Sequence, residues 1–413
     1  MDSIYNKLPT ERRPTILFVA QSKTTGGVVR VLSEILMKWP EEDTRRLLLI
    51  HNKAHGGKDT FKEISAVNNK VQIEEASLWD YNFQLDKIES KKEIMRFFQK
   101  LVNKFFHFCF YCRNVIFFYK KCIRKNVEVI FSHNGGYPGG ELNRASIVGA
   151  KLARVPEKIL VVHNLAVPLA WWRWPAGYLV DRCLNWAVDK IVVVSKSCGE
   201  VLRQERYFSK PFHVIYNGIS IDSRNNDRGG GLKDVWVTLS NKIAFVGELA
   251  PRKGVHILLE AVSDLKCDFV VILFGAGESK YVDKLHKMVK ELGIEQNVVF
   301  QGYNPYARQK LQYVDLLVLP SLTYESFGMT ILEAMYWKRP VVVTDTGGMK
   351  EIIEDGAEGF VVPAGDAVRL KDAIQRILLD KDLMRTLGKK GFEKLCSKFN
   401  AVEMVGQYYK LTR

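Results

Sequence analysis

The chain has 413 residues, of which 47% are hydrophobic, and a formal net charge of +15 at pH 7. This length exceeds what one hydrophobic core usually supports and predicts two domains, while the charge indicates an anionic partner. Seven irregularly spaced cysteines, no uncharged apolar run of about 18 residues and a polar start, MDSIYNKLPTERRP, exclude three classes of protein: disulfide-framed, membrane-spanning and secreted. We therefore expect a cytoplasmic protein.

Apolar, β-branched runs alternate with longer segments of helical periodicity, which is typical of a parallel sheet built from βαβ units. Gly26 and Gly27 follow the first of these runs and precede a helix expected over 28–39. The two glycines either let the backbone approach an anion at the helix start or form only a tight turn. In the first half we expect strands at 15–20, 47–50, 127–132, 158–163, 190–195 and 212–216.

The segment 87–126 carries eleven Lys or Arg residues against two Glu residues, which is most of the excess charge. Arg96, Lys100 and Lys104 repeat every four residues, beside a stripe rich in phenylalanine. This pattern indicates either a helix that lies on an anionic membrane or an ordinary core-facing helix with a charged outer side. No RNA-binding motif accompanies the charge, so we expect no nucleic-acid partner.

Several polar and aromatic residues of the first half are candidates for substrate contacts. His163 ends a strand and is either structural or bonds a sugar hydroxyl or shares a proton near a reaction centre. Trp171, Trp172 and Trp174 cluster in WWRWP, which suits an acceptor or membrane contact as well as packing under a C-terminal helix. The glycine-rich loop HNGGYPGGELNR, which contains Tyr137, is a second candidate for acceptor binding.

The stretch 222–234, DSRNNDRGGGLKD, is rich in glycine and charge and predicts a linker between domains over 1–221 and 235–394. After Asp366 the pattern becomes helical, and we expect 395–413 to pack back on the first domain. In the second half we expect strands at 242–246, 269–274, 298–301, 316–319 and 340–344, with a short edge strand at 359–362.

Two pairs of charged residues in the second half suit a sugar nucleotide. Arg252 and Lys253 follow a strand where a loop opens into a helix, so they could hold a diphosphate. Glu325 stands before, and Glu333 inside, a helix expected to begin near Gly328. Carboxylates accept paired hydrogen bonds from vicinal diols, and helix-start amides favour phosphate. The pattern predicts a pocket for a sugar joined to a nucleotide diphosphate.

Neither a nicotinamide cofactor nor a metal ion is expected. The GxGxxG dinucleotide fingerprint is absent, because Lys280 stands at its third glycine position in FGAGESK. Asp380, Lys381 and Asp382 resemble the DxD of metal-using sugar transferases, but they lie in a charged, surface-like helical region. We expect the nucleotide sugar to be a co-substrate and no other cofactor to be needed.

These motifs together resemble the retaining nucleotide-sugar glycosyltransferases of GT-B fold in glycosyltransferase family 4, also called group 1. The resemblance rests on ESFGMTILEA, VIYNGIS, FVGELAPRKGV and TDTGGMKEIIEDGAEGFVV in the second half, and on TTGGVVRV, VVHN and IVVVSKS in the first. It implies an α/β protein with two Rossmann-like, doubly wound parallel-sheet domains that face an interdomain cleft.

The resemblance also implies roles for the site residues. Glu325 would contact the hydroxyls of the donor sugar and Glu333 the ribose diol, while Arg252 and Lys253 would hold the diphosphate. His163 would lie beside the anomeric centre. The remaining donor-binding positions are backbone positions at two helix starts, namely Gly26, Gly27, Phe327, Gly328, Met329 and Thr330.

One position departs from the family. Many relatives carry arginine directly after the glycine of the FVG strand, and here that position is Glu248. We expect Arg252 to supply the missing cation.

The expected activity is metal-independent, retaining transfer of a hexose-type sugar to a glycan or glycolipid, in bacterial surface polysaccharide or lipopolysaccharide synthesis. The basic segment would place the enzyme peripherally on the inner face of the cell membrane. The alternatives are a nucleotide-sugar epimerase or sugar phosphorylase of the same architecture, or a non-catalytic sugar-nucleotide-binding membrane scaffold. The motifs do not encode the donor base or sugar, the acceptor or the oligomeric state.

Overall fold

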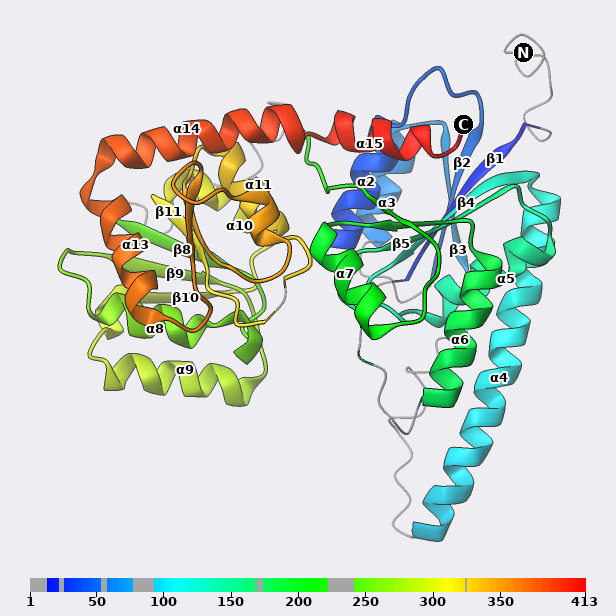
Figure 1. Cartoon of the computed structure of the whole chain (residues 1–413), viewed down its shortest axis with the longest axis horizontal. Coiled ribbons are helices and arrows are strands. Elements are labelled where there is room, and N and C mark those ends of the chain that lie inside the picture. Colours follow the sequence, from blue (N-terminus) through cyan, green and yellow to red (C-terminus); the bar gives the residue numbers. More distant parts are fainter. Residues whose placement is uncertain are drawn as a thin grey trace. The chain divides into compact units, whose positions relative to one another are not determined.

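A computed structural model describes residues 13–21, 26–52, 58–76, 93–166, 168, 174–221, 241–323 and 325–413. The chain divides into two compact units (Figure 1). The first unit takes in the described residues up to Val194, Cys198–Ile215 and Val405–Arg413. The second takes in Ser195–Ser197 and the described residues from Tyr216 to Met404. Each unit holds one parallel sheet.

In the described part of the chain, the sheet of the first unit has seven parallel strands in the order β3-β2-β1-β4-β5-β6-β7. The central strand β1 has the sequence TILFVA, and all six residues are buried, as a parallel strand covered on both faces requires. The strands are β1 (Thr15–Ala20), β2 (Arg46–Asn52), β3 (Val71–Ala76), β4 (Val127–Asn134), β5 (Glu157–Val162), β6 (Lys190–Val193) and β7 (Phe212–Val214).

Helices cover this sheet. Helix α2 buries an apolar stripe that begins at Val29, because its apolar residues recur at helical spacing. Helices α4, α5 and α6 pack together, and α2 packs on α3 (Figure 1). The helices of this unit are α2 (Gly27–Lys38), α3 (Lys58–Val67), α4 (Glu93–Arg124), α5 (Glu141–Leu152), α6 (Trp174–Ala187) and α7 (Lys196–Glu205), with the last residues of α15 (Ala401–Lys410).

The second unit also holds a parallel sheet, which has six strands in the described residues, in the order β10-β9-β8-β11-β12-β13. Its core strands are short apolar runs that are buried throughout, such as LLVL in β11. The strands are β8 (Lys242–Val246), β9 (Val270–Phe274), β10 (Val298–Gly302), β11 (Leu316–Leu319), β12 (Val341–Thr344) and β13 (Gly359–Val362).

The helices of the second unit follow its strands in the doubly wound manner. Helix α8 packs on α9 and α13, and α11 packs on α14 (Figure 1). The helices are η6 (Pro251–Lys253), α8 (Val255–Ser263), α9 (Ser279–Glu291), η7 (Glu295–Asn297), α10 (Ala307–Lys310), η8 (Leu311–Tyr313), α11 (Met329–Tyr336), α12 (Met349–Ile352), α13 (Ala367–Leu379) and α14 (Lys381–Lys398).

The expected fold class, two Rossmann-like parallel-sheet domains, is confirmed. Every expected strand is present within three residues at either end, but β3 was not expected. The first unit gives way to the second at Tyr216 rather than after residue 221, and the expected linker 222–234 lies outside the described residues. Helix α14 runs through residue 395, and the return to the first unit begins at Val405. Among the described residues, no helix is both long enough and apolar enough to cross a membrane.

Candidate active site

Lys253 of the second unit is the last residue of η6, in the loop that follows β8. Gly254 comes next with φ of +68°, and a Cβ there would collide with the carbonyl of Pro320. The backbone amide of Leu322 donates to the carbonyl of Arg252 at 2.8 Å. The loop after β8 therefore packs closely against the segment after β11.

This packing brings Lys253 to Glu325. The Lys253 ammonium forms an ion pair with Glu325 Oε2, and the two side chains are only 17% and 19% exposed. The residues are separated by 72 positions in the sequence. The structure thus joins the residue expected to hold the diphosphate to the residue expected to hold the donor sugar.

Arg252 differs from its neighbour. Its Nη2 lies 2.6 Å from Oε2 of Glu248, four residues earlier, and both side chains are about half exposed. Glu248 is the residue that replaces the arginine of many relatives. Arg252 was expected to substitute for that cation, but in this structure its guanidinium is already paired with the carboxylate of Glu248.

The turn between Glu325 and α11 is built by glycines. The amide of Gly348 donates to the carbonyl of Glu325 at 2.8 Å, and a Cβ on Gly347, whose φ is +57°, would collide with the same carbonyl. Gly328 has φ of +92° and caps the N-terminus of α11. Only glycine adopts such angles readily, so these positions fix the path of the turn.

The other expected donor-binding residues lie at the start of α11 or one turn inside it. Phe327 is buried in the core, whereas Met329 and Thr330 are half-buried at the first helical positions. Glu333 is 1% exposed in the interior of α11. A buried carboxylate inside a helix whose start follows the turn of Glu325 is an arrangement suited to polar ligands.

In the first unit, His163 follows β5 and contacts a second histidine. His133 Nδ1 lies 2.9 Å from His163 Nε2, and the rings stack with centroids 5.1 Å apart. Burial lowers the pKa of His163 to about 4. Burial, together with the neighbouring His163, also holds the pKa of His133 well below its usual value, so both rings are neutral at neutral pH.

His133 was not singled out from the sequence, although the glycine-rich loop that begins with it was. The signal was present: both histidines stand at the carboxyl ends of apolar strands, and β4 and β5 are neighbours in the sheet. Side chains at the ends of adjacent parallel strands meet at one edge.

Gly26 and Gly27 lie where the sequence placed them, at the start of α2, and both are exposed. The carbonyl of Gly26 accepts a hydrogen bond from the amide of Val29 at 3.1 Å. Gly26 has an extended backbone with φ of −76°, which any residue adopts. The geometry of Gly26 therefore fits the simple turn as well as an anion site.

Tyr137 does not lie on an acceptor-binding surface, which corrects the expectation from its loop. Its side chain is fully buried, and its hydroxyl donates to Asp181 Oδ1 at 2.6 Å. Arg206 pairs with the same carboxylate at 2.7 Å and stacks over the Tyr137 ring. Trp171 and Trp172, and the side chain of Trp174, lie outside the described residues.

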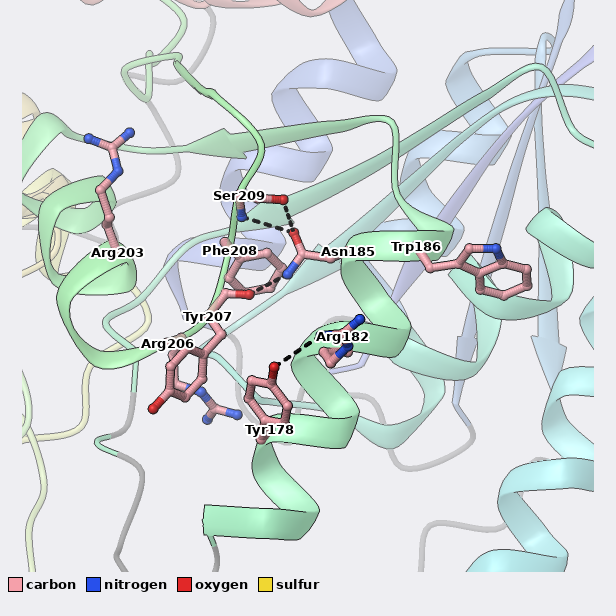
Figure 2. A pocket seen from close by; sticks show the side chains of 9 residues that line it. All are labelled: Tyr178, Arg182, Asn185, Trp186, Arg203, Arg206, Tyr207, Phe208 and Ser209. Carbon is pink, nitrogen blue, oxygen red and sulfur yellow. Dashed lines mark hydrogen bonds between the residues drawn. The ribbon is translucent and has the colours of Figure 1, made fainter.

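A hollow of about 640 Å³ opens on the first unit between α6 and the segment that follows α7 (Figure 2). Asn185 of α6 holds that segment, because its side chain bonds the carbonyl of Tyr207 and the amide of Ser209. The lining is aromatic and basic and comprises Tyr178, Arg182, Asn185, Trp186, Arg203, Arg206, Tyr207, Phe208 and Ser209.

No metal-binding group of three or more His, Cys, Asp or Glu side chains is found within the described ranges. Asp380, the first carboxylate of the DxD-like triplet, has a structural role instead. Its side chain accepts hydrogen bonds from the amides of Asp382 and Leu383 and so caps the N-terminus of α14.

Comparison with known proteins identifies a family for both halves. Residues 235–394 match the family "Glycosyl transferases group 1", and residues 79–223 match "Glycosyltransferase Family 4". The chain is 35% identical over 166 residues to the lipopolysaccharide core biosynthesis glycosyltransferase LpsE of Rhizobium meliloti. The matched region covers 40% of this chain and 48% of that protein.

A second relative, N-acetyl-alpha-D-glucosaminyl L-malate synthase of Bacillus anthracis, is 26% identical over 236 residues, which cover 55% of this chain and 61% of the relative. The chain thus spans about half the length of these curated relatives.

Solved structures share the fold over nearly the whole chain. Anabaena Alr3699/HepE in complex with UDP-glucose superimposes with a TM-score of 0.72 and 21% identity, and the match covers 96% of this chain and 98% of that one. The galactosyltransferase WaaB of the lipopolysaccharide outer core superimposes with a TM-score of 0.65 and 17% identity, over 97% and 99% of the two chains. The chain belongs to the group 1, family 4 glycosyltransferases of GT-B fold.

Proposed function

We propose that the protein transfers a hexose-type sugar from a nucleotide-diphosphate sugar to a glycan or glycolipid, with retention of the anomeric configuration. One observation carries this proposal: the Lys253–Glu325 ion pair stands at the turn into α11, whose interior holds the buried carboxylate of Glu333. A structural neighbour binds UDP-glucose, and one curated relative is named for lipopolysaccharide core biosynthesis, which supports the same substrate class.

In this proposal the second unit binds the donor. The ammonium of Lys253 offsets the negative charge that grows on the departing diphosphate, and the backbone amides at the start of α11 donate hydrogen bonds to phosphate oxygens. Glu325 accepts hydrogen bonds from hydroxyls of the sugar, and Glu333 from the ribose diol. The reaction needs no metal ion, because the Lys253 ammonium and the helix dipole of α11 supply the stabilisation of charge.

Retention follows from a front-face displacement, in which the leaving phosphate itself takes the proton of the acceptor hydroxyl. Glu325 is engaged by Lys253 and serves to hold the sugar rather than to attack it. The bond from the anomeric carbon to the phosphate oxygen breaks as the bond to the acceptor oxygen forms on the same face. No side-chain base is required.

We also propose that the protein lies peripherally on an anionic membrane, and helix α4 supports this proposal. From Phe108 onwards, where its side chains are described, the helix exposes Phe108, Ile116 and Ile123 at spacings of eight and seven residues. Exposed Arg113 and Lys120 lie between them. Large apolar residues beside cations on one helix suit the interface of an anionic bilayer. Arg96, Lys100 and Lys104 lie on the same helix, with side chains outside the described residues.

The central experiment is a thermal-shift screen against UDP, GDP and ADP sugars, since a ligand that binds the folded state raises the melting temperature by mass action. The stabilising donor is then incubated with lipid-linked and soluble glycans. Proton NMR of the product reports the anomeric configuration, and an EDTA control tests for metal. Inversion or loss of transfer in EDTA contradicts the corresponding part of the proposal.

The same assay separates the alternatives. An epimerase converts the donor without an acceptor, and a phosphorylase requires phosphate, whereas the proposed transferase consumes the donor only with an acceptor. A binding scaffold gives the thermal shift without turnover.

The membrane proposal is tested by binding to anionic liposomes. If the protein still binds them after Arg96, Lys100 and Lys104 are neutralised, these three cations are not the anchor.

A further inference from the structure

The histidine pair of the first unit is buried and held on both sides. His133 is fully buried and His163 is 8% exposed, so only His163 reaches the surface. The ring of Tyr408, from the C-terminal helix α15, stacks on His133 at 6.2 Å, and Phe131 lies at 6.4 Å. His133 is therefore held in place by aromatic neighbours, and its ring does not contact a ligand directly.

The hydrogen bond between the rings leaves each histidine one other nitrogen. His133 Nδ1 and His163 Nε2 share the bond at 2.9 Å. His163 Nδ1 has no hydrogen-bond partner among the described residues, and neither has His133 Nε2. Both of these nitrogens are buried. His163 is the ring with a partly exposed edge, and Nδ1 is its one ring nitrogen without a partner among the described residues, so Nδ1 is the candidate atom for a substrate contact.

Two tautomeric arrangements satisfy the shared bond. Each neutral ring carries one proton, so either His163 Nε2–H donates to His133 Nδ1, or His133 Nδ1–H donates to His163 Nε2. Neutral imidazole side chains intrinsically favour the proton on Nε2. In the first arrangement both rings carry their proton on Nε2. In the second arrangement both rings carry it on Nδ1. The first arrangement is therefore favoured, and it leaves a lone pair on His163 Nδ1.

We infer that His133 is a positioning residue, which fixes His163 as a hydrogen-bond acceptor, through Nδ1, for a hydroxyl group of the sugar substrates. This inference rests on the proposed function. A carbohydrate presents many hydroxyl donors, so a ring locked as an acceptor binds a hydroxyl without first exchanging its tautomer. His163 touches the substrate, and His133 acts only through His163.

The tautomer is measured directly by NMR of protein labelled with ¹⁵N in its eight histidine rings. The signal of His163 is assigned from its loss in His163→Gln. In the wild-type protein we expect a protonated Nε2 and an unprotonated Nδ1. Protonation of His163 at Nδ1 instead overturns the inference, whether or not the protein has activity.

Two variants of His133 test the positioning role. His133→Phe keeps a stacked ring but removes the acceptor, so we expect loss of the single tautomer of His163 and a fall in kcat of about tenfold, equal to one hydrogen bond. His133→Asn offers its amide oxygen near the position of Nδ1. It should restore both the tautomer and activity to within about threefold of wild type.

Tyr408→Phe is the matched control, because it alters the other neighbour of His133 and leaves the shared hydrogen bond intact. We expect it to change neither the tautomer nor kcat. A fall in kcat in His133→Phe with an unchanged His163 tautomer shows a merely structural role and overturns the inference. Absence of transfer by the wild type, with the expected tautomer present, refutes the proposed function and the substrate role of His163, but leaves the assigned geometry intact.

Discussion

Lys253 and Glu325 form an ion pair that joins the loop after β8 to the turn before α11. The pair is largely buried, so each charge depends on the other in the absence of substrate. Removing one partner leaves an uncompensated charge in a partly desolvated place, which costs more than the loss of an exposed pair. The pair also keeps both side chains in place before a donor binds.

The first prediction concerns this pair. Lys253→Met and Glu325→Gln should each lower kcat by about a hundredfold. The first removes the charge that stabilises the departing diphosphate, and the second weakens the bonds to the sugar hydroxyls and leaves Lys253 without its partner. Steady-state kinetics with the donor found by thermal shift measure the change. The control is the exposed pair Lys287–Glu291 on α9, at 3.4 Å, whose neutralisation should leave kcat unchanged. Wild-type turnover in Lys253→Met would exclude Lys253 from the reaction.

The second prediction separates backbone strain from steric fit at Gly347. Alanine at Gly347 must adopt φ of +57°, and its Cβ would collide with the Glu325 carbonyl. Gly293 has φ of +67° with no atom within 4 Å of its Cβ position. Gly293→Ala should cost about 1 kcal/mol of unfolding free energy and leave kcat intact. Gly347→Ala should cost about 3 kcal/mol and also lower kcat, because the Glu325 turn must move.

Urea unfolding and kinetics of the two glycine variants provide the measurement. Equal losses of stability in both variants would show that the carbonyl of Glu325 shifts without cost to make room for the alanine Cβ. The turn would then be less tightly specified by Gly347 than the close approach indicates.

Much of the fold was predictable because central parallel strands are continuous apolar runs that periodicity detects. Strand β3 was missed for the opposite reason. It lies at the edge of its sheet, and its sequence VQIEEA places glutamates where a central strand has apolar residues. An edge strand keeps one side in solvent, so the hydrophobic pattern that marks a strand is weak there.

The members of the candidate site were predictable, but their partners were not. Motif spacing selects Lys253 and Glu325, yet their ion pair depends on how two loops 72 residues apart pack together. Arg252 likewise gains its partner Glu248 only when η6 forms. Tyr137 was misplaced because a glycine-rich loop suggests exposure, whereas the buried Asp181 carboxylate draws its hydroxyl into the core.

The third prediction concerns Glu248. Its exposed ion pair with Arg252 is worth about 0.2–1 kcal/mol, and diphosphate binding must compete with it if Arg252 holds the donor. Glu248→Gln should therefore tighten the binding of UDP by up to about fivefold, and raised salt should reduce the difference between variant and wild type. Calorimetric titration measures both. Unchanged affinity in Glu248→Gln, together with unchanged affinity in Arg252→Ala, would remove Arg252 from the donor site.

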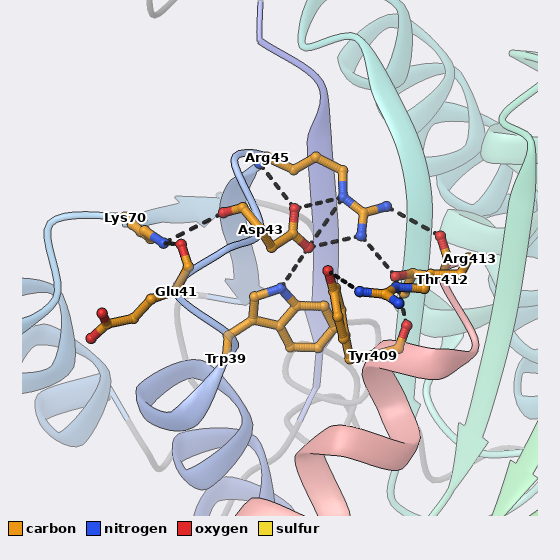
Figure 3. Close-up of polar contacts among 8 residues, drawn as sticks. All are labelled: Trp39, Glu41, Asp43, Arg45, Lys70, Tyr409, Thr412 and Arg413. Carbon is orange, nitrogen blue, oxygen red and sulfur yellow. Dashed lines mark hydrogen bonds and ion pairs between the residues drawn. The ribbon is translucent and has the colours of Figure 1, made fainter. Parts of the chain in front are cut away.

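The fourth prediction concerns Asp43, which links α2 to the end of the chain (Figure 3). Its carboxylate accepts hydrogen bonds from Trp39 Nε1 at 2.9 Å and from Arg45 Nη2 at 2.7 Å, and Arg45 also bonds Thr412 Oγ1. Burial alone would raise the pKa of Asp43, but the bonds from Arg45 and Trp39 outweigh it and lower the pKa below 3.8.

A folded-state pKa below the unfolded value means that Asp43 stabilises the protein above about pH 4 and that this stability is lost as the pH falls through the folded pKa. Asp43→Asn should be less stable than wild type at pH 7, with a difference that shrinks as the pH falls below about 4. Urea unfolding at several pH values measures it. A difference that is constant from pH 7 to pH 3 would contradict the assigned role.

The fifth prediction concerns Tyr408, whose buried hydroxyl has no hydrogen-bond partner among the described residues. The ring packs against Phe131 at 5.8 Å and stacks on His133, so the side chain stabilises the first unit through its aromatic surface. A buried hydroxyl without a partner costs about 1 kcal/mol or more. Tyr408→Phe should therefore raise the unfolding free energy by about 1 kcal/mol, whereas Tyr408→Ala should lower it by about 3–5 kcal/mol through the cavity it leaves. If Tyr408→Phe instead destabilises the protein in urea unfolding, the hydroxyl has a partner in solution, such as a buried water that bridges it to His133 Nε2.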